Sequence, residues 1–168
     1  MRELETDRLR LRPLTFGDAD FIVELLNEPS FLRYIGDKGV RDQASACRYL
    51  EAGPLASYAR FGFGLLCVEL RPAGVPIGIC GLLKRDTLED VDVGFAFLPG
   101  YWGRGYAREA ASAVLAQGRD AFGLKRIVAI TSLDNEASIR LLGRLGFHFE
   151  RVTRLTPDAD EVKLFSSE

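Results

Sequence analysis

The sequence predicts a mixed α/β (α+β) fold, in which a central sheet carries helices on both faces. Two strand patterns, over residues 63–70 and 76–83, are joined by Arg71-Pro-Ala-Gly-Val75, a loop typical of an antiparallel hairpin. Strand and helix patterns alternate in the second half of the chain, which favours strand–helix–strand units. We expect residues 1–168 to form one domain, because the length suits one and no repeat or linker divides them.

The first half of the chain begins with leucines that alternate with arginines from Leu9 to Leu14, as in a half-buried strand. Residues 15–27 predict a helix with Asp18 as a cap, and Pro29 should end it. Residues 42–58 predict a second helix, interrupted at Gly53-Pro54.

The second half of the chain contains its longest predicted helix, from about Gly105 to Phe122, with Gly123 at the C-terminal cap. A strand over residues 91–98 precedes it. The other predicted elements are a strand over 126–131, a helix over 135–145, and strands over 147–153 and 162–165.

Composition indicates an ordinary globular protein, with 47% hydrophobic residues, 27% charged residues and a formal net charge of −2. Charges of both signs are interspersed, so we expect no nucleic-acid partner. The longest apolar run, Phe61 to Val68, is too short to cross a bilayer, and the first residues resemble no signal peptide. The three cysteines lack Cys-x-x-Cys spacing, so we expect no metal, no disulfides and a cytoplasmic location.

A glycine-rich loop, Tyr101-Trp-Gly-Arg-Gly-Tyr-Ala107, lies between a strand and the long helix. Unpaired N–H groups at a helix start, approached closely through glycines, form a site for phosphate oxygens. The ATP-binding pattern fails because no lysine–hydroxyl pair follows, and the dinucleotide pattern fails because Arg108 replaces its third glycine. The loop therefore favours another cofactor that carries a pyrophosphate.

These residues resemble the GNAT acetyltransferase superfamily, specifically its RimJ/RimL-like branch. The family loop Gln/Arg-x-x-Gly-x-Gly/Ala matches residues 102–107, except that Trp102 replaces Gln or Arg. Residues 101–110 are similar to the branch's form of this loop, residues 135–147 to the family's second cofactor motif, and residues 6–13 to the branch's first strand. The resemblance covers nearly the whole chain.

The resemblance implies a mostly antiparallel sheet of about seven strands, with one splayed strand pair that holds acetyl-CoA. The pantetheine arm would pair with exposed backbone at Phe97 and Leu98. The resemblance also suggests a homodimer. The implied cofactor-binding residues are Phe97, Leu98, Trp102, Gly103, Arg104, Gly105, Tyr106, Ala107, Arg108, Asn135 and Ser138.

The family often places a tyrosine as the proton donor seven residues after the asparagine, and this chain has Leu142 there. Members of the branch carry a serine at the position of Ser138, so Ser138 is the candidate for support of the thiolate. Asn135 and Ser138 could instead only cap a helix.

Asp92 is the candidate general base, because the branch often has Glu at this point and Gly94 beside it leaves room for a substrate. Glu89 and Asp90 are the alternatives. His148, the single histidine, follows Gly-Phe on a strand and is expected to be structural.

Amine basicity favours one class of acceptor. An N-terminal amine with a pKa of about 7.7 is roughly one-sixth neutral at pH 7, whereas a lysine with a pKa of about 10.4 is neutral at roughly four parts in ten thousand. A site with one aspartate therefore favours a protein N-terminal α-amine over lysine, with a small amine as the other candidate. We expect the acceptor near residues 31–34. Without the tyrosine, a non-catalytic acyl-CoA-binding module is the alternative function.

Overall fold

The computed structural model describes residues 2–168, which form an eight-stranded sheet in the order β1-β2-β3-β4-β5-β6-β8-β7. Neighbouring strands are antiparallel except β5 and β6, which are parallel. The mixed, mostly antiparallel sheet is thereby confirmed. The strands are β1 (Leu4–Glu5), β2 (Leu9–Pro13), β3 (Leu65–Leu70), β4 (Val75–Leu83), β5 (Asp92–Phe97), β6 (Ile127–Ser132), β7 (His148–Arg154) and β8 (Glu161–Ser167).

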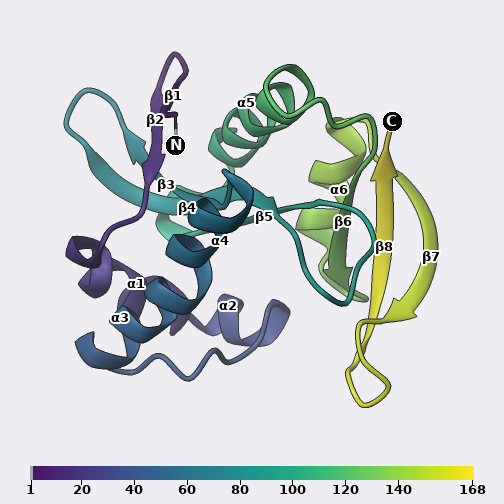
Figure 1. Cartoon of the computed structure of the whole chain (residues 1–168), viewed down its shortest axis with the longest axis horizontal. Helices are drawn as coiled ribbons and strands as arrows, with labels where there is room; N and C mark the ends of the chain where they lie inside the picture. Colours follow the sequence, from purple (N-terminus) through teal and green to yellow (C-terminus); the bar gives the residue numbers. More distant parts are fainter. Residues whose placement is uncertain (1) are drawn as a thin grey trace.

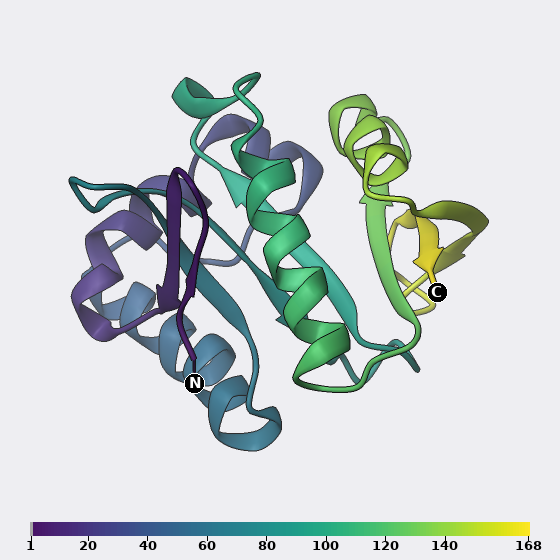
Figure 2. The ribbon, with the colours of Figure 1, turned by 90° about the horizontal axis from the view of Figure 1, so that it is seen from above.

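The strand that the sequence did not predict is β1, which has only two residues and pairs with β2. A strand this short has too few residues to show an alternating pattern. Its hairpin with β2 brings residues 6–8 close to the start of the long helix, as Figure 2 shows from above.

The parallel pair β5–β6 splays apart, as the resemblance implied. The two strands share a single paired position, Asp92 with Val128, and the N–H of Val128 donates to the carbonyl of Val91 at 3.0 Å. Beyond this point the strands diverge, and Figure 1 shows β6, β8 and β7 turning away from the first five strands. The divergence leaves the inner edges of β5 and β6 without a neighbouring strand.

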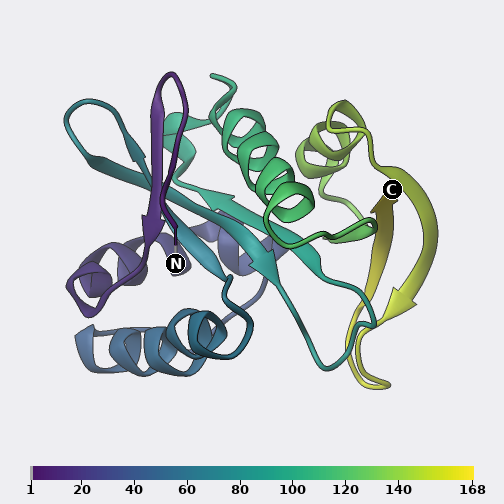
Figure 3. The same cartoon turned by 45° about the horizontal axis from the view of Figure 1, so that its top comes forward.

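Two helical layers cover the sheet, as predicted. The helices α5 (Tyr106–Asp120) and α6 (Glu136–Arg144) pack on one face around Leu82, Val114 and Ile127. The remaining helices lie over the opposite face (Figure 3); the first three pack around Ile22, Leu50 and Ile79, and the fourth packs through Tyr58 and Phe61 against the cluster that contains Leu82. These helices are α1 (Ala19–Leu26), α2 (Pro29–Tyr34), α3 (Gln43–Leu50) and α4 (Ala56–Phe61).

The structure corrects the predicted capping of the first helix. Thr15, rather than Asp18, caps the opening turn (Phe16–Asp18), and Asp18 completes its capping box. The Asp18 carboxylate also pairs with Arg12 at 2.8 Å, which explains why this charge is buried. Pro29 does more than end α1, because it is the first residue of α2.

The helix predicted over residues 42–58 forms as two helices. Asp42 and Ser45 make a capping box at the start of α3. A π-helical turn over Glu51–Leu55 contains Pro54 and joins α3 to α4, which continues to Phe61. No helix within residues 2–168 is long and apolar enough to cross a membrane.

Candidate active site

A cavity of about 760 Å³ lies where β5 and β6 separate, on the side of the sheet that carries α1–α4. Its walls come from α2, the α3–α4 segment, the β4–β5 loop, β6, the first turns of α6 and the β7–β8 hairpin. Phe31 and Tyr34, near which the acceptor is expected, line it. Both candidate catalytic residues, Asp92 and Ser138, also line it.

Asp92 lies at the first position of β5 and is almost fully buried, with 1% of its surface exposed. It shares its face of the strand with Gly94 and Ala96, which also line the cavity. Its Oδ1 accepts a hydrogen bond from Arg85 Nε at 3.1 Å, while its Oδ2 has no partner within residues 2–168. Burial raises the pKa of Asp92, and Arg85 opposes that rise only in part. The result is a carboxylate with one free oxygen and more than ordinary basicity.

The two alternative bases lie outside the cavity lining. Asp90 accepts a hydrogen bond from Arg126 Nε at 3.0 Å, so that it belongs to a surface ion-pair group. Glu89 is exposed. His148 is exposed on β7 and does not line the cavity either. Among Asp92, Glu89, Asp90 and His148, only Asp92 lines the cavity.

Asn135 and Ser138 stand at the start of α6 and line the cavity. The Asn135 carboxamide oxygen accepts a hydrogen bond from the backbone N–H of Ser138 at 3.3 Å, so Asn135 does cap the helix. This cap uses the backbone of Ser138 and leaves its hydroxyl free. Leu142, one turn later on the same helix face, is buried and also lines the cavity, where it offers no proton donor.

Two hydroxyl groups that the sequence analysis missed lie on β6. The Oγ1 of Thr131 and the Oγ of Ser132 are buried, line the cavity and have no hydrogen-bond partner within the described chain. Buried polar atoms normally find a partner, so these two are poised to bond a molecule that enters between β5 and β6. The sequence carried no signal for them, since Thr-Ser at a strand end is common.

The glycine-rich loop lies beyond the cavity, at the carboxyl end of β5. Gly103 and Gly105 adopt positive φ angles of 74° and 82°, a conformation that glycine takes without strain. Within residues 2–168, no acceptor meets the backbone N–H groups of residues 103–108. Six successive free donors at a helix N-terminus fit a pyrophosphate, and the exposed Arg104 and Arg108 add positive charge.

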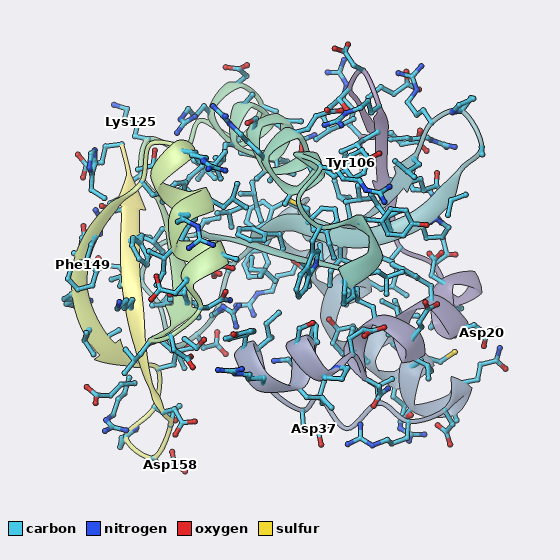
Figure 4. The ribbon with its side chains drawn as sticks, turned by 180° about the vertical axis from the view of Figure 1, so that it is seen from behind. Asp20, Asp37, Tyr106, Lys125, Phe149 and Asp158 are labelled. Atoms are coloured by element: carbon cyan, nitrogen blue, oxygen red, sulfur yellow. The ribbon has the colours of Figure 1, made fainter. Side chains whose placement is uncertain are left out.

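Arg8, which the sequence analysis did not single out, holds this loop in place. Its Nη1 donates to the carbonyl of Arg104 at 2.9 Å, its Nε pairs with Glu109 at 2.8 Å, and its guanidinium lies 4.4 Å from the ring centre of Tyr106. Figure 4 shows Tyr106 on the first turn of α5, beside the β1–β2 hairpin. Thr6 adds a hydrogen bond to Glu109. Burial alone would raise the pKa of Glu109, but the hydrogen bonds from Thr6 and Arg8 outweigh it and lower that pKa.

The backbone at Phe97 and Leu98, where the resemblance implied pairing with the pantetheine arm, is largely bonded within the described chain. The Leu98 N–H donates to Ile77 at 2.9 Å and its carbonyl accepts from Tyr101 at 3.0 Å. The indole Nε1 of Trp102 donates to the Phe97 carbonyl at 2.9 Å. The N–H of Leu98 faces β4. Because backbone groups point to alternate sides along a strand, the N–H and carbonyl groups of residues 93, 95 and 97 point the other way, toward the gap between β5 and β6. The free edge therefore centres on Phe95.

Comparison with known proteins agrees with this geometry. Residues 8–148 match the family model described as "Acetyltransferase (GNAT) domain". The chain belongs to the GNAT acetyltransferase family. It is 32% identical over 153 residues to the "Uncharacterized N-acetyltransferase YoaA" of Bacillus subtilis, an alignment that covers 90% of this chain and 85% of that protein.

Solved structures show the same fold. An acetyltransferase from Agrobacterium tumefaciens matches with a TM-score of 0.84 and 28% identity, over 100% of this chain and 95% of the other. RimL, described as a ribosomal alpha-N-protein acetyltransferase in complex with coenzyme A, matches with a TM-score of 0.81 and 15% identity, over 99% and 97% of the two chains. Membership of the GNAT family makes the chain an acyltransferase, and the GNAT fold implies that it binds acetyl-CoA.

Replacing Arg8 by alanine should weaken coenzyme A binding by about threefold to tenfold in this GNAT domain, because the loop loses the hydrogen bond and ion pair that hold it. Calorimetric titration with coenzyme A measures the change. Arg10→Ala is the matched control, since Arg10 pairs with Glu3 on the β1–β2 hairpin and does not touch the loop. Equal affinities for the two variants would show that Arg8 does not position the loop.

Proposed function

We propose that this GNAT domain is an acetyl-CoA-dependent N-acetyltransferase of the RimJ/RimL-like branch that acetylates a primary amine by direct attack in a ternary complex. One arrangement carries the proposal. The six free N–H groups of residues 103–108 lie at the carboxyl end of β5, and the buried carboxylate of Asp92 lies at its start, in the cavity. A cofactor laid along β5 from the loop would bring its thioester end to the cavity.

Acetyl-CoA supplies the acetyl group as a thioester. The N–H groups of residues 103–108 bind its pyrophosphate, and the backbone edge around Phe95 pairs with its pantetheine arm. Trp102 closes the outer end of that edge through its bond to Phe97.

Asp92 accepts the proton that the amine loses as the amine nitrogen bonds to the acetyl carbon and the carbon–sulfur bond breaks. Its raised pKa suits this role, because a carboxylate of ordinary pKa is a weak base toward an amine. The Ser138 hydroxyl donates a hydrogen bond to the sulfur as negative charge develops there.

Direct attack is favoured over a covalent acetyl-enzyme by the state of the cysteines. Burial raises the pKa of both Cys67 and Cys80 to about 12, so neither is a thiolate at neutral pH. None of the three cysteines lines the cavity. The described part of the chain thus offers no activated thiol for a two-step transfer.

The acceptor is proposed to be an α-amine, at a protein N-terminus or on a small molecule. Asp92 is the one carboxylate among the described residues that combines burial with a position in the cavity, and an α-amine needs less help to lose its proton than a lysine does. The likeness to RimL lies at the level of the fold, so the branch assignment rests on the sequence motifs.

Release of free thiol from acetyl-CoA in the presence of an amine panel tests the proposed function. The panel contains peptides with free N-termini, polyamines and aminoglycosides. Turnover with any of them supports an enzyme of this class. Tight binding of coenzyme A without turnover or acceptor binding would instead support the acyl-CoA-binding module.

Replacing Ser138 by alanine should lower kcat about tenfold and leave the KM for acetyl-CoA nearly unchanged, because the hydrogen bond strengthens only as charge develops on sulfur. The helix cap survives, since it uses the backbone N–H of Ser138. Steady-state kinetics measure both constants. Asn135→Ala is the comparison variant: it removes the cap and should cost about 1 kcal/mol of stability. A Ser138→Ala enzyme with normal kcat and poor cofactor affinity would make Ser138 a binding residue.

A further inference from the structure

Four cationic side chains line the cavity, and only one of them has a carboxylate partner within residues 2–168. Arg85 pairs with Asp92 at 3.1 Å, whereas Lys38, Arg60 and Lys84 have no carboxylate within 4.0 Å. The Lys84 ammonium already donates hydrogen bonds to the backbone carbonyls of Arg85 and Leu88. Arg60 lies 4.8 Å from the ring centre of Phe61. The positive groups that have no hydrogen-bond partner within the described chain are Lys38, the outer nitrogens of Arg85, and Arg60, whose guanidinium lies against a ring.

Lys38, Tyr49 and Arg85 line the same cavity, and their hydrogen-bond donors are here called the donor cluster. Partial burial and then the charge of Arg85 lower the pKa of Lys38. Burial raises the pKa of Tyr49, and the charge of Arg85 opposes that rise. Both side chains share the cavity with the Arg85 guanidinium. Neither the Lys38 ammonium nor the Tyr49 hydroxyl has a hydrogen-bond partner in the described chain, so both are available to an anion.

The donor cluster adjoins the proposed base. Arg85 touches Asp92 Oδ1, while the free oxygen of the same carboxylate is the proposed site of the amine. An acceptor that binds Asp92 through its amine and the donor cluster through a negative charge must therefore carry these two groups only a few bonds apart. Asp86 and Asp160 also line the cavity; both are exposed, as Lys38 is, and neither makes an ion pair within the described chain.

We propose that the acceptor is a primary amine with a carboxylate a few bonds away, and that the donor cluster binds that carboxylate. The inference rests on the proposed N-acetyltransferase function and narrows its substrate class. A free α-amino acid has this chemistry, and so does a peptide whose first residue is aspartate or glutamate.

The experiment compares acids with their amides. Acetyl-CoA turnover is measured with a panel of free α-amino acids and the matching amino-acid amides, and kcat/KM is expressed per concentration of neutral amine to remove the difference in amine pKa. The acids are expected to exceed the amides by about tenfold or more, since a charged hydrogen bond is lost with the carboxylate. Equal or better turnover of the amides overturns the proposal for free amino acids, and it overturns the proposal as a whole when peptides that begin with Asp or Glu also show no preference over those that begin with Asn or Gln.

A second pair of acceptors distinguishes the two sources of the carboxylate. Peptides that begin with Asp or Glu are compared with the same peptides beginning with Asn or Gln. A preference confined to the free amino acids identifies a small-molecule acceptor. A preference confined to the acidic peptides identifies a protein N-terminus.

Variants of the donor cluster locate the effect. Lys38→Gln and Tyr49→Phe should raise the KM for the acid acceptors, by about tenfold for Lys38, and remove most of the acid-over-amide preference. The KM for acetyl-CoA should stay unchanged. Arg48→Gln is the matched control, because Arg48 is an exposed cation on α3 outside the cavity lining. A preference that survives in both cluster variants overturns the assignment.

Binding measurements separate this inference from the proposed function. Where no acceptor turns over, thermal unfolding of the coenzyme A-loaded protein is measured with acids and amides. Stabilisation by acids alone still supports the donor cluster, and equal or absent stabilisation overturns it. Failure to bind coenzyme A would count against the proposed function, whereas turnover of amides and acids alike counts against this inference only.

Discussion

Replacing Asp92 by asparagine should lower the rate of acetyl transfer at pH 7 by about a hundredfold or more, within the usual range for loss of a general base. The substitution keeps the shape of the side chain but replaces one carboxylate oxygen by NH2 and removes the negative charge, so the side chain no longer acts as a base. Steady-state kinetics with an α-amine acceptor measure the effect. With a lysine acceptor the loss of rate should be larger. The additional loss corresponds to up to about 3.5 kcal/mol of activation free energy, since lysine holds its proton more tightly.

The pH dependence of this variant distinguishes a base from a positioning group. Burial raises the pKa of Asp92, so the acidic limb of the wild-type pH–rate profile should lie above the ordinary range for aspartate. Asp92→Asn should lack that limb, and its deficit should shrink as pH rises past the amine pKa. A deficit that stays constant across this range would mean that Asp92 only orients the substrate.

Two controls accompany the measurement. Asp90→Asn makes the same chemical change two residues away, outside the cavity lining, and should leave the rate nearly unchanged. Thermal unfolding at pH 7 checks the fold. A raised pKa means that ionised Asp92 disfavours the folded state above that pKa, so the neutral Asn variant should not unfold at a lower temperature.

Replacing Gly105 by valine should weaken coenzyme A binding by well over tenfold. The new side chain would stand in the loop whose free N–H groups face the pyrophosphate, with its Cβ 3.3 Å from Arg8 Nη2. It would also disturb the contact between Arg8 and the carbonyl of Arg104. Calorimetric titration of the folded variant with coenzyme A gives the result.

The backbone strain of this variant needs its own control. Gly105 has a φ of 82°, and valine in that region costs about 1–3 kcal/mol. Gly123, at the other end of α5, has a φ of 63° and no atom within 4 Å of an added Cβ. Gly123→Val should therefore lose similar stability and keep its affinity for coenzyme A. Equal losses of affinity would attribute the effect to strain and remove the loop from the cofactor site.

Local patterns determined most of the elements of this GNAT domain. The leucine–arginine alternation of β2, the hairpin loop at residues 71–75 and the glycines at both ends of α5 depend on interactions within a few residues, so the sequence alone predicts them. The loop at residues 101–107 was recognisable for the same reason, because its motif is contiguous. The face that Asp92 shares with Gly94 and Ala96 follows from the two-residue period of a strand.

The tertiary structure alone decided which distant residues meet. Arg8 and Glu109 are 101 positions apart in the sequence. No local pattern predicts that Arg8 pairs with Glu109 and holds the glycine-rich loop in place. The donor cluster brings Lys38, Tyr49 and Arg85 from three separate segments to the cavity that Asp92 also lines. Burial likewise depends on the whole fold, and it is burial that raises the pKa of Asp92 and leaves the hydroxyls of Thr131 and Ser132 without partners. Sequence periodicity reports the face on which a side chain lies, whereas its partners and its solvation are set by elements that pack against it from elsewhere in the chain.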